Sequence, residues 1–335
     1  MPANLNTALN FLETQWSSIT ENKTKGVLAE IRFISYLNTA SVLPLYDYII
    51  PGGWIITPSK NTIVSIPTNN RIVIIPNFNE FSWTGAISRH SLTAQVIAHS
   101  YFRQAGMHVY FADIDVPITP ALEVTFQSPS AGSYPTTYDL VFKKVHKDGL
   151  INVPVTDVMG NFPSRVGLRG LRSYASGRLN RAVLPWTSTG IVSELFWKEY
   201  SRYFLQRKYL VSNNDLDFFI VSKTGKAYPL EFKSKASVKD DNSVGEWFGL
   251  DDGTFAKLSY FVSISNNMDA LFVVEEIDDT TSVHIEWWGI KFSELLKGCS
   301  WVTQPGGRGM GGGATSTIKV PKLIFTKLID LLPKL

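Results

Sequence analysis

The stretch AYPLEFKSK, Ala227–Lys235, alternates apolar and charged residues, with Glu231, Lys233 and Lys235 each two positions apart. Side chains two residues apart on a strand share a face, so these three charges would project to one side of a sheet. Leu230 and Phe232 would then point to the other side. A charged face within a sheet is costly unless it has partners, so the pattern indicates either a solvated surface strand or a cation site.

The composition is that of a folded protein in a reducing compartment. The chain has 335 residues, of which 44% are hydrophobic and 18% charged, enough for one large domain or two smaller ones. Its one cysteine, Cys299, excludes an intrachain disulfide and a cysteine-based zinc site. The first residues lack a basic and apolar leader, and no run of about 18 apolar residues occurs, so we expect a cytoplasmic protein without a membrane span.

Two acidic residues, Asp215 and Asp217, stand just before the apolar run FFIV. The turn KTGKA connects this run to AYPLEFKSK, which predicts a hairpin that brings Asp217 close to Glu231. Two carboxylates in a partly buried site repel each other, and a divalent cation removes that repulsion. Mg²⁺ binds through one or two carboxylates together with waters and substrate phosphate, so Asp217 and Glu231 are the expected metal ligands.

The surrounding elements predict an α/β sheet. Residues 193–209 have the spacing of an amphipathic helix, the two hairpin strands follow, and residues 251–265 and 270–278 read as a helix and a strand. The chain contains no H-x-x-H, G-x-S-x-G or P-loop motif, so zinc-hydrolase, serine-hydrolase and nucleotide-driven motor functions have no support.

With this order of elements, the pattern Asp217 … Glu231-Phe232-Lys233 resembles the PD-(D/E)xK nuclease superfamily over residues 188–277. The resemblance implies a restriction-endonuclease-like core, a central mixed β-sheet flanked by helices. The helix opening GIVSE, Gly190–Glu194, is similar to the G-x-x-x-E that opens the family's first helix. One departure is the absence of proline before the aspartate.

The resemblance implies a role for each site residue. Asp217 and Glu231 would hold Mg²⁺, Lys233 would activate the water, and Glu194 would support the metal site. Asp215 is the alternative to Asp217, and Glu199 the alternative to Glu194. We favour Asp217 because it directly precedes the apolar run, and Glu194 because Gly190 stands four residues before it.

Two segments without acidic residues predict contact with DNA. Arginine forms bidentate contacts with phosphate and with guanine, so clustered arginines without acids favour a nucleic-acid partner over a solvated linker. The expected DNA-binding residues are Arg165, Arg169, Arg172, Arg178 and Arg181 in residues 158–193, Arg308 in residues 295–329, and Lys235 beside the site.

The chain therefore divides, by sequence, into an N-terminal α/β region (residues 1–157) for DNA recognition or dimerisation, an arginine-rich connector (158–187) and a catalytic core (188–335). The N-terminal region contains an echo of the catalytic helix: Gly26 stands four residues before Glu30 in KGVLAE. No Glu-x-Lys follows it, so a degenerate copy of the core and an unrelated recognition domain both remain open.

By resemblance, the expected function is that of a type II restriction endonuclease: a homodimer that cuts double-stranded DNA at a specific sequence with Mg²⁺. A structure-specific repair or recombination nuclease, similar to a junction resolvase, is the first alternative. Its cores are usually smaller, and the long N-terminal half argues against it. A non-catalytic DNA-binding protein with an incidental Glu-x-Lys is the second.

Overall fold

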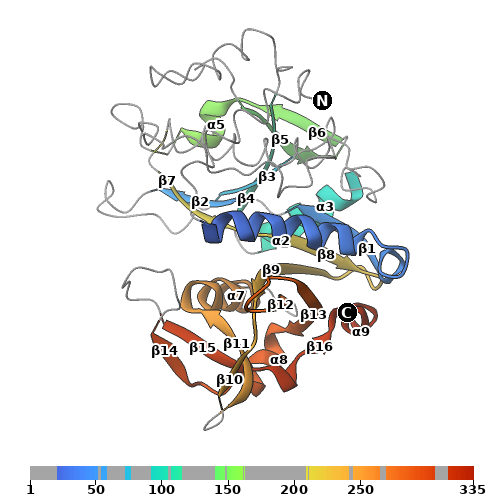
Figure 1. The fold of residues 1–335 in the computed structure, drawn as a ribbon. Helices are drawn as coiled ribbons and strands as arrows, with labels where there is room; N and C mark the ends of the chain where they lie inside the picture. The colour runs from blue at the N-terminus through green and yellow to red at the C-terminus, as the bar shows by residue number, and fades with distance from the viewer. Residues whose placement is uncertain are drawn as a thin grey trace, which may run out of the picture. The chain divides into compact units, whose positions relative to one another are not determined.

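The protein has a mixed α/β architecture, seen here in a computed structural model (Figure 1). Its described strands form two six-stranded sheets and one four-stranded sheet. The structure describes residues 21–51, 54–58, 72–76, 92–104, 107–114, 140–147, 149–160, 162, 209, 211–240, 244–264, 269–305 and 316–335.

The chain forms two compact units that differ from the division expected from sequence. Unit 2 consists of Lys25–Pro51 and Leu216–Leu335, and unit 1 of Met1–Thr24 and Gly52–Asp215. The expected boundaries at residues 157 and 188 coincide with neither unit. The physical reason is that strand β1 (Tyr46–Pro51) pairs with a strand more than 150 residues further along the chain, a partner that local sequence patterns do not specify.

The six-stranded sheet of unit 2 has the order β1-β8-β9-β12-β13-β16. Only the β9–β12 pair is parallel, and the other four pairs are antiparallel. The bounds after β1 are β8 (Phe218–Ser222), β9 (Ala227–Lys235), β12 (Leu271–Ile277), β13 (His284–Lys291) and β16 (Thr326–Lys327). The quoted stretch is thus β9, an interior strand between β8 and β12.

One face of this sheet packs against α2 (Glu21–Leu37). Phe33 of α2 is fully buried and contacts Phe218, Phe232 and Trp287, with its ring stacked on Phe232 at a centroid distance of 5.0 Å. Arg32 of α2 donates two hydrogen bonds, of 2.6 and 2.8 Å, to the fully buried carboxylate of Glu275 in β12. These contacts attach a segment from the start of the chain to the C-terminal sheet.

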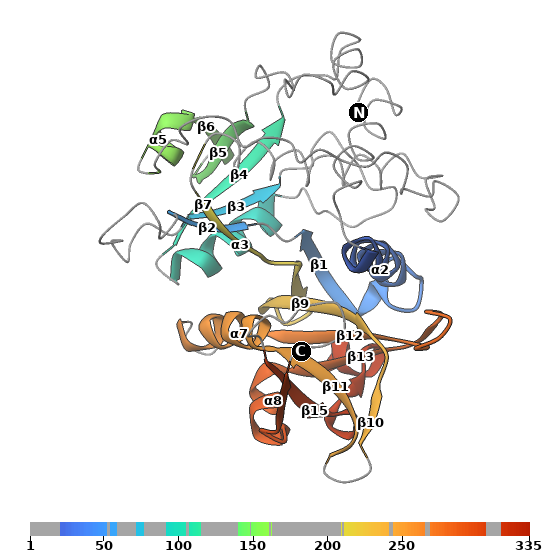
Figure 2. The same cartoon turned by 60° about the vertical axis from the view of Figure 1, so that its left-hand side comes forward.

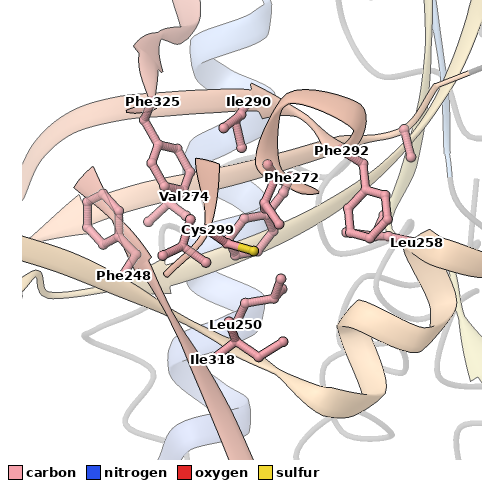
Figure 3. Packing of buried hydrophobic residues seen from close by; sticks show 13 residues of the cluster. Phe248, Leu250, Leu258, Phe272, Val274, Ile290, Phe292, Cys299, Ile318 and Phe325 are labelled. Atoms are coloured by element: carbon pink, nitrogen blue, oxygen red, sulfur yellow. The ribbon is translucent and has the colours of Figure 1, made fainter. Parts of the chain in front are cut away.

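The other face carries α7 (Asp252–Ile264) and α8 (Phe292–Gly298), and Figure 2 shows α7 beside β9. Its core, shown in Figure 3, contains Phe272 and Val274 of β12, Leu258 of α7 and the buried Cys299. The four-stranded sheet also contributes to this core; its strands are β10 (Val238–Asp240), β11 (Gly245–Asp251), β15 (Ser316–Pro321) and β14 (Thr303–Pro305), in the order β10-β11-β15-β14. The chain ends with α9 (Leu328–Leu331), and short 3₁₀ turns occur at Leu43–Leu45, Lys322–Ile324 and Leu332–Lys334.

Unit 1 contains the second six-stranded sheet, in the order β6-β5-β4-β3-β2-β7. Its strands are β2 (Trp54–Pro58), β3 (Ile72–Pro76), β4 (His108–Ile114), β5 (Leu140–His146), β6 (Gly149–Val153) and β7 (Val211–Asp215). The helices among its described residues are α3 (Leu92–Gln104) and α5 (Val155–Met159). Tyr101 and Phe102 of α3 are buried, as are Phe111 of β4 and Phe142 of β5.

Several sequence-based expectations agree with these elements. The helix expected over residues 251–265 corresponds to α7, and the expected hairpin is formed by β8 and β9 with Phe218 facing Leu230. Gly225 in its turn has φ +76°, a conformation that favours glycine. In the described residues, no helix is long and apolar enough to cross a membrane.

Candidate active site

The backbone of unit 2 places Asp217 and Glu231 opposite each other. Phe218 faces Leu230 across the antiparallel β8–β9 pair, so the next position on each strand brings Asp217 towards Glu231 on the same face. The backbone N–H of Phe232 donates a 2.8 Å hydrogen bond to Oδ2 of Asp217, which fixes the aspartate at the start of β8. The expected proximity of the two carboxylates is therefore present.

Asp217 is held in an environment that favours its protonated form. Burial is the main cause, and the negative charge of Glu231 adds to it, so that the pKa of Asp217 rises to about 7. Lys233 and Lys257 oppose the shift, and Glu30 contributes to it. The Asp217 carboxyl is therefore the more easily protonated member of the pair.

Glu231 is 3% exposed and is surrounded by donors. Lys233 Nζ donates to Oε1 at 2.8 Å, and the Thr254 hydroxyl donates to the same oxygen at 3.3 Å. Lys257 Nζ forms an ion pair with Oε2. Burial favours protonation, but the two ammonium groups outweigh it and hold the pKa of Glu231 below its usual range. Glu231 is thus a buried, ionised carboxylate.

Lys233 and Lys235 follow Glu231 on one face, but they have different surroundings. Burial opposes the charge of Lys233, yet Glu231 and Asp217 raise the pKa of this lysine above its usual value. Lys235 Nζ instead donates to the Gly249 carbonyl at 2.8 Å and lies 3.4 Å from Asp251 Oδ1, and burial lowers its pKa. The ammonium of Lys235 is therefore engaged by β11, whereas Lys233 belongs to the carboxylate pair.

The donor set of the site suits a hard divalent cation. Asp217 and Glu231 supply two oxygen ligands, which is typical of Mg²⁺ with its remaining positions taken by water and phosphate. Burial is the main cause of the raised pKa of Asp217 and the charge of Glu231 adds to it, and a bound cation would offset both effects. Among the residues that the structure describes, no group of three or more histidine, cysteine, aspartate or glutamate residues could hold a metal.

Three residues at this site were not predicted from the sequence. Thr254 and Lys257 stand three residues apart on one face of α7, and both contact Glu231. Their spacing is visible in the sequence, but the sequence does not indicate which residue they contact. The third is Glu30 of α2, whose charge acts on Asp217. Gly26 and Glu30 form the G-x-x-x-E pattern noted in the N-terminal half, so the signal existed but was assigned to another part of the fold.

Asp215 and Asp217, the two alternatives for the metal ligand, lie in different units. Asp215 ends β7 and pairs with Trp54 in the unit 1 sheet, whereas Asp217 belongs to unit 2 and contacts the backbone beside Glu231. The remaining expected residues lie outside the described part of the chain, and their roles stay predictions. They are Glu194, Glu199, Arg165, Arg169, Arg172, Arg178, Arg181 and Arg308.

Comparison with known proteins identifies no relative: no family model matches the chain, and neither a curated protein nor a solved structure does.

Proposed function

We propose that the protein is a Mg²⁺-dependent endonuclease that cuts double-stranded DNA at a specific sequence, similar to type II restriction enzymes of the PD-(D/E)xK superfamily. The observation that carries this proposal is the cluster of Asp217, Glu231 and Lys233 on interior strands of a mixed sheet. A surface strand would leave these charges in solvent, but here Glu231 is buried and paired.

The arrangement of unit 2 supports a restriction-endonuclease-like core. Its elements around the site follow the chain order α2, β1, β8, β9, β10, β11, α7 and β12, in which β1, β8 and β9 pair antiparallel and β12 pairs parallel with β9. From Asp217 onward, with β10 and β11 as additions, the order of Asp strand, Glu-x-Lys strand, helix and strand is the one that the resemblance implies. Glu194 lies outside the described residues, and Glu30 of α2, whose charge acts on Asp217, is a second candidate for the supporting role.

The chemistry follows from the charges around Glu231. A bound Mg²⁺ would lower the pKa of its water and polarise the scissile phosphate. Asp217 and Glu231 would hold the ion, and Thr254 keeps Glu231 in place. Lys233, an ammonium with three donors and no acceptor, orients the attacking water and stabilises the negative charge that develops on phosphate.

Lys257 supplies a second ammonium group at the same carboxylate. Its contact with Glu231 competes with a cation for Oε2, so metal binding would release the ammonium towards the phosphate. The arginine-rich segment and Arg308 would supply the phosphate and base contacts that position the duplex. Two chains would form the homodimer expected for a palindromic site.

Plasmid cleavage tests the function directly. Wild-type protein should convert supercoiled plasmid into discrete fragments with Mg²⁺ and leave it intact with EDTA. Lys233→Ala should lose at least 100-fold in rate yet still bind DNA, whereas Lys226→Ala, an exposed lysine in the β8–β9 turn, should cleave normally.

The products also separate the alternatives. Cleavage restricted to branched DNA would indicate a structure-specific nuclease instead. DNA binding that is indifferent to Mg²⁺, without any nicking, would refute the nuclease function altogether.

A further inference from the structure

The two six-stranded sheets repeat one topology. In unit 2 the successive pairs β1·β8, β8·β9, β9·β12, β12·β13 and β13·β16 are antiparallel, antiparallel, parallel, antiparallel and antiparallel. In unit 1 the pairs β7·β2, β2·β3, β3·β4, β4·β5 and β5·β6 have the same series. The parallel pair is bridged in each unit by a helix, α7 or α3. Five pairings in the same order indicate two copies of one fold.

Only the first strand of each copy departs from chain order. β1 directly precedes β2 yet pairs with β8, and β7 directly precedes β8 yet pairs with β2. Figure 1 shows the exchange by colour, because the blue β1 lies beside the yellow β8. Two residues separate β1 from β2 and two separate β7 from β8, the length of the commonest β-hairpin loop. The copies have therefore exchanged strands that could each have closed a local hairpin.

The exchange brings a helix with it. Phe33 and Arg32 of α2 pack on β9 and β12, and Glu30 of the same helix acts on Asp217. Helix α2 thus belongs to unit 2 together with the candidate site, although it precedes β2 in the chain, which explains why no Glu-x-Lys follows the G-x-x-x-E pattern of Gly26 and Glu30 in the N-terminal half.

Strand registers align the two copies residue by residue. In unit 1, Trp54 of β2 faces Ile74 of β3, and in unit 2 Phe218 of β8 faces Leu230 of β9. Across the parallel pair that follows, Ile74 faces Tyr110 in unit 1 and Leu230 faces Leu271 in unit 2. Trp54 also faces Asp215 as Phe218 faces Pro51. Counted along the sequence from these anchors, the residues that match Asp217, Glu231 and Lys233 are Gly53, Ile75 and Asn77, of which Gly53 and Asn77 lie outside the described residues. None of these three residues carries a charge, so the sequence of unit 1 has neither the two carboxylates nor the ammonium at the matching positions.

We propose, building on the nuclease function above, that unit 1 is a non-catalytic copy of the core and that each chain holds one hydrolytic site. Breaking a DNA duplex requires a cut in each of its two strands, which have opposite polarity. A single hydrolytic site faces only one of these DNA strands while the chain is bound in one orientation. A chain therefore nicks a single strand in one binding event. A double-strand break requires a second copy of the chain, although each chain has two cores.

Mixing subunits tests this proposal. Wild-type chains are combined with a tenfold excess of Asp217→Asn chains, so that most DNA-bound assemblies contain at most one intact site. A plasmid with one cleavage site should then accumulate nicked circles, whereas wild type alone should produce linear DNA. Linear DNA as the main product of the mixture would overturn the proposal, because one chain would then be cutting both strands.

A double variant locates the chemistry independently. The double variant Asp217→Asn, Glu231→Gln keeps side-chain shapes and should retain less than 1% of wild-type cleavage, with folding checked by circular dichroism. Residual Mg²⁺-dependent cleavage of a tenth or more would reveal a second site and overturn the proposal.

The matched pair Lys233→Ala and Asn77→Ala should differ sharply: a loss of at least 100-fold for the first and a change within twofold for the second. A loss of 100-fold for Asn77→Ala as well would also overturn the proposal. Wild-type protein that cleaves no DNA would instead refute the nuclease function itself.

Discussion

Replacing Asp217 with asparagine should make the metal-free protein more stable. The folded protein raises the pKa of Asp217 from 3.8 to about 7, mainly through burial. Between these two values the folded chain holds a proton that the unfolded chain releases, so wild-type stability falls as the pH rises through this window. Asparagine is neutral at every pH and can still accept the hydrogen bond from the Phe232 N–H.

The size of the gain follows from the shift. Three pKa units correspond to about 4 kcal/mol, so Asp217→Asn should gain about 4 kcal/mol at pH 8 and only about 1 kcal/mol at pH 4.5. Urea unfolding in EDTA at these two pH values measures both numbers. A residue kept at such a cost to stability is typical of a functional site.

Two controls sharpen the experiment. Hydrogen bonds from Thr281 and Thr280 lower the pKa of the exposed Asp278, so Asp278→Asn should lose stability at pH 8 rather than gain it. Adding Mg²⁺ should stabilise wild type and not Asp217→Asn, because only the wild type has both ligands. The reasoning fails if Asp217→Asn is no more stable than wild type at pH 8, or if its gain does not depend on pH.

Three further substitutions have defined outcomes. Lys257→Gln should slow cleavage by about 100-fold and, because a competitor for Glu231 is removed, strengthen Ca²⁺ binding measured by calorimetry; weaker Ca²⁺ binding would contradict this role. Arg32→Ala should cost about 2 kcal/mol in urea unfolding, because the fully buried Glu275 loses its bidentate partner, and Arg32→Lys should cost less; equal losses would count against the bidentate contact. Phe33→Ala should cost about 3–5 kcal/mol through its contacts with three aromatic rings, and a loss below 1 kcal/mol would show that α2 is not docked on the sheet.

Local patterns in the chain were sufficient for the β8–β9 hairpin, for α7 and for the shared face of Glu231, Lys233 and Lys235. Each depends on interactions between residues close in sequence: turn chemistry, period-two alternation or helical spacing. The same patterns found the pair Asp217 and Glu231, because a hairpin register relates positions only fourteen residues apart.

Tertiary packing alone decided that α2 lies on the sheet that carries the site. Sequence spacing indicated Glu194, which lies outside the described residues, whereas α2, whose Glu30 acts electrostatically on Asp217, lies on this sheet because β1 pairs with β8 and Phe33 stacks on Phe232 of β9. The stretches before β2 and before β8 both suit a closed hairpin, so no local rule distinguishes the exchanged pairing from the unexchanged one. The choice depends on long-range contacts such as that between Arg32 and Glu275, 243 residues apart, which form only once both halves of the chain have folded.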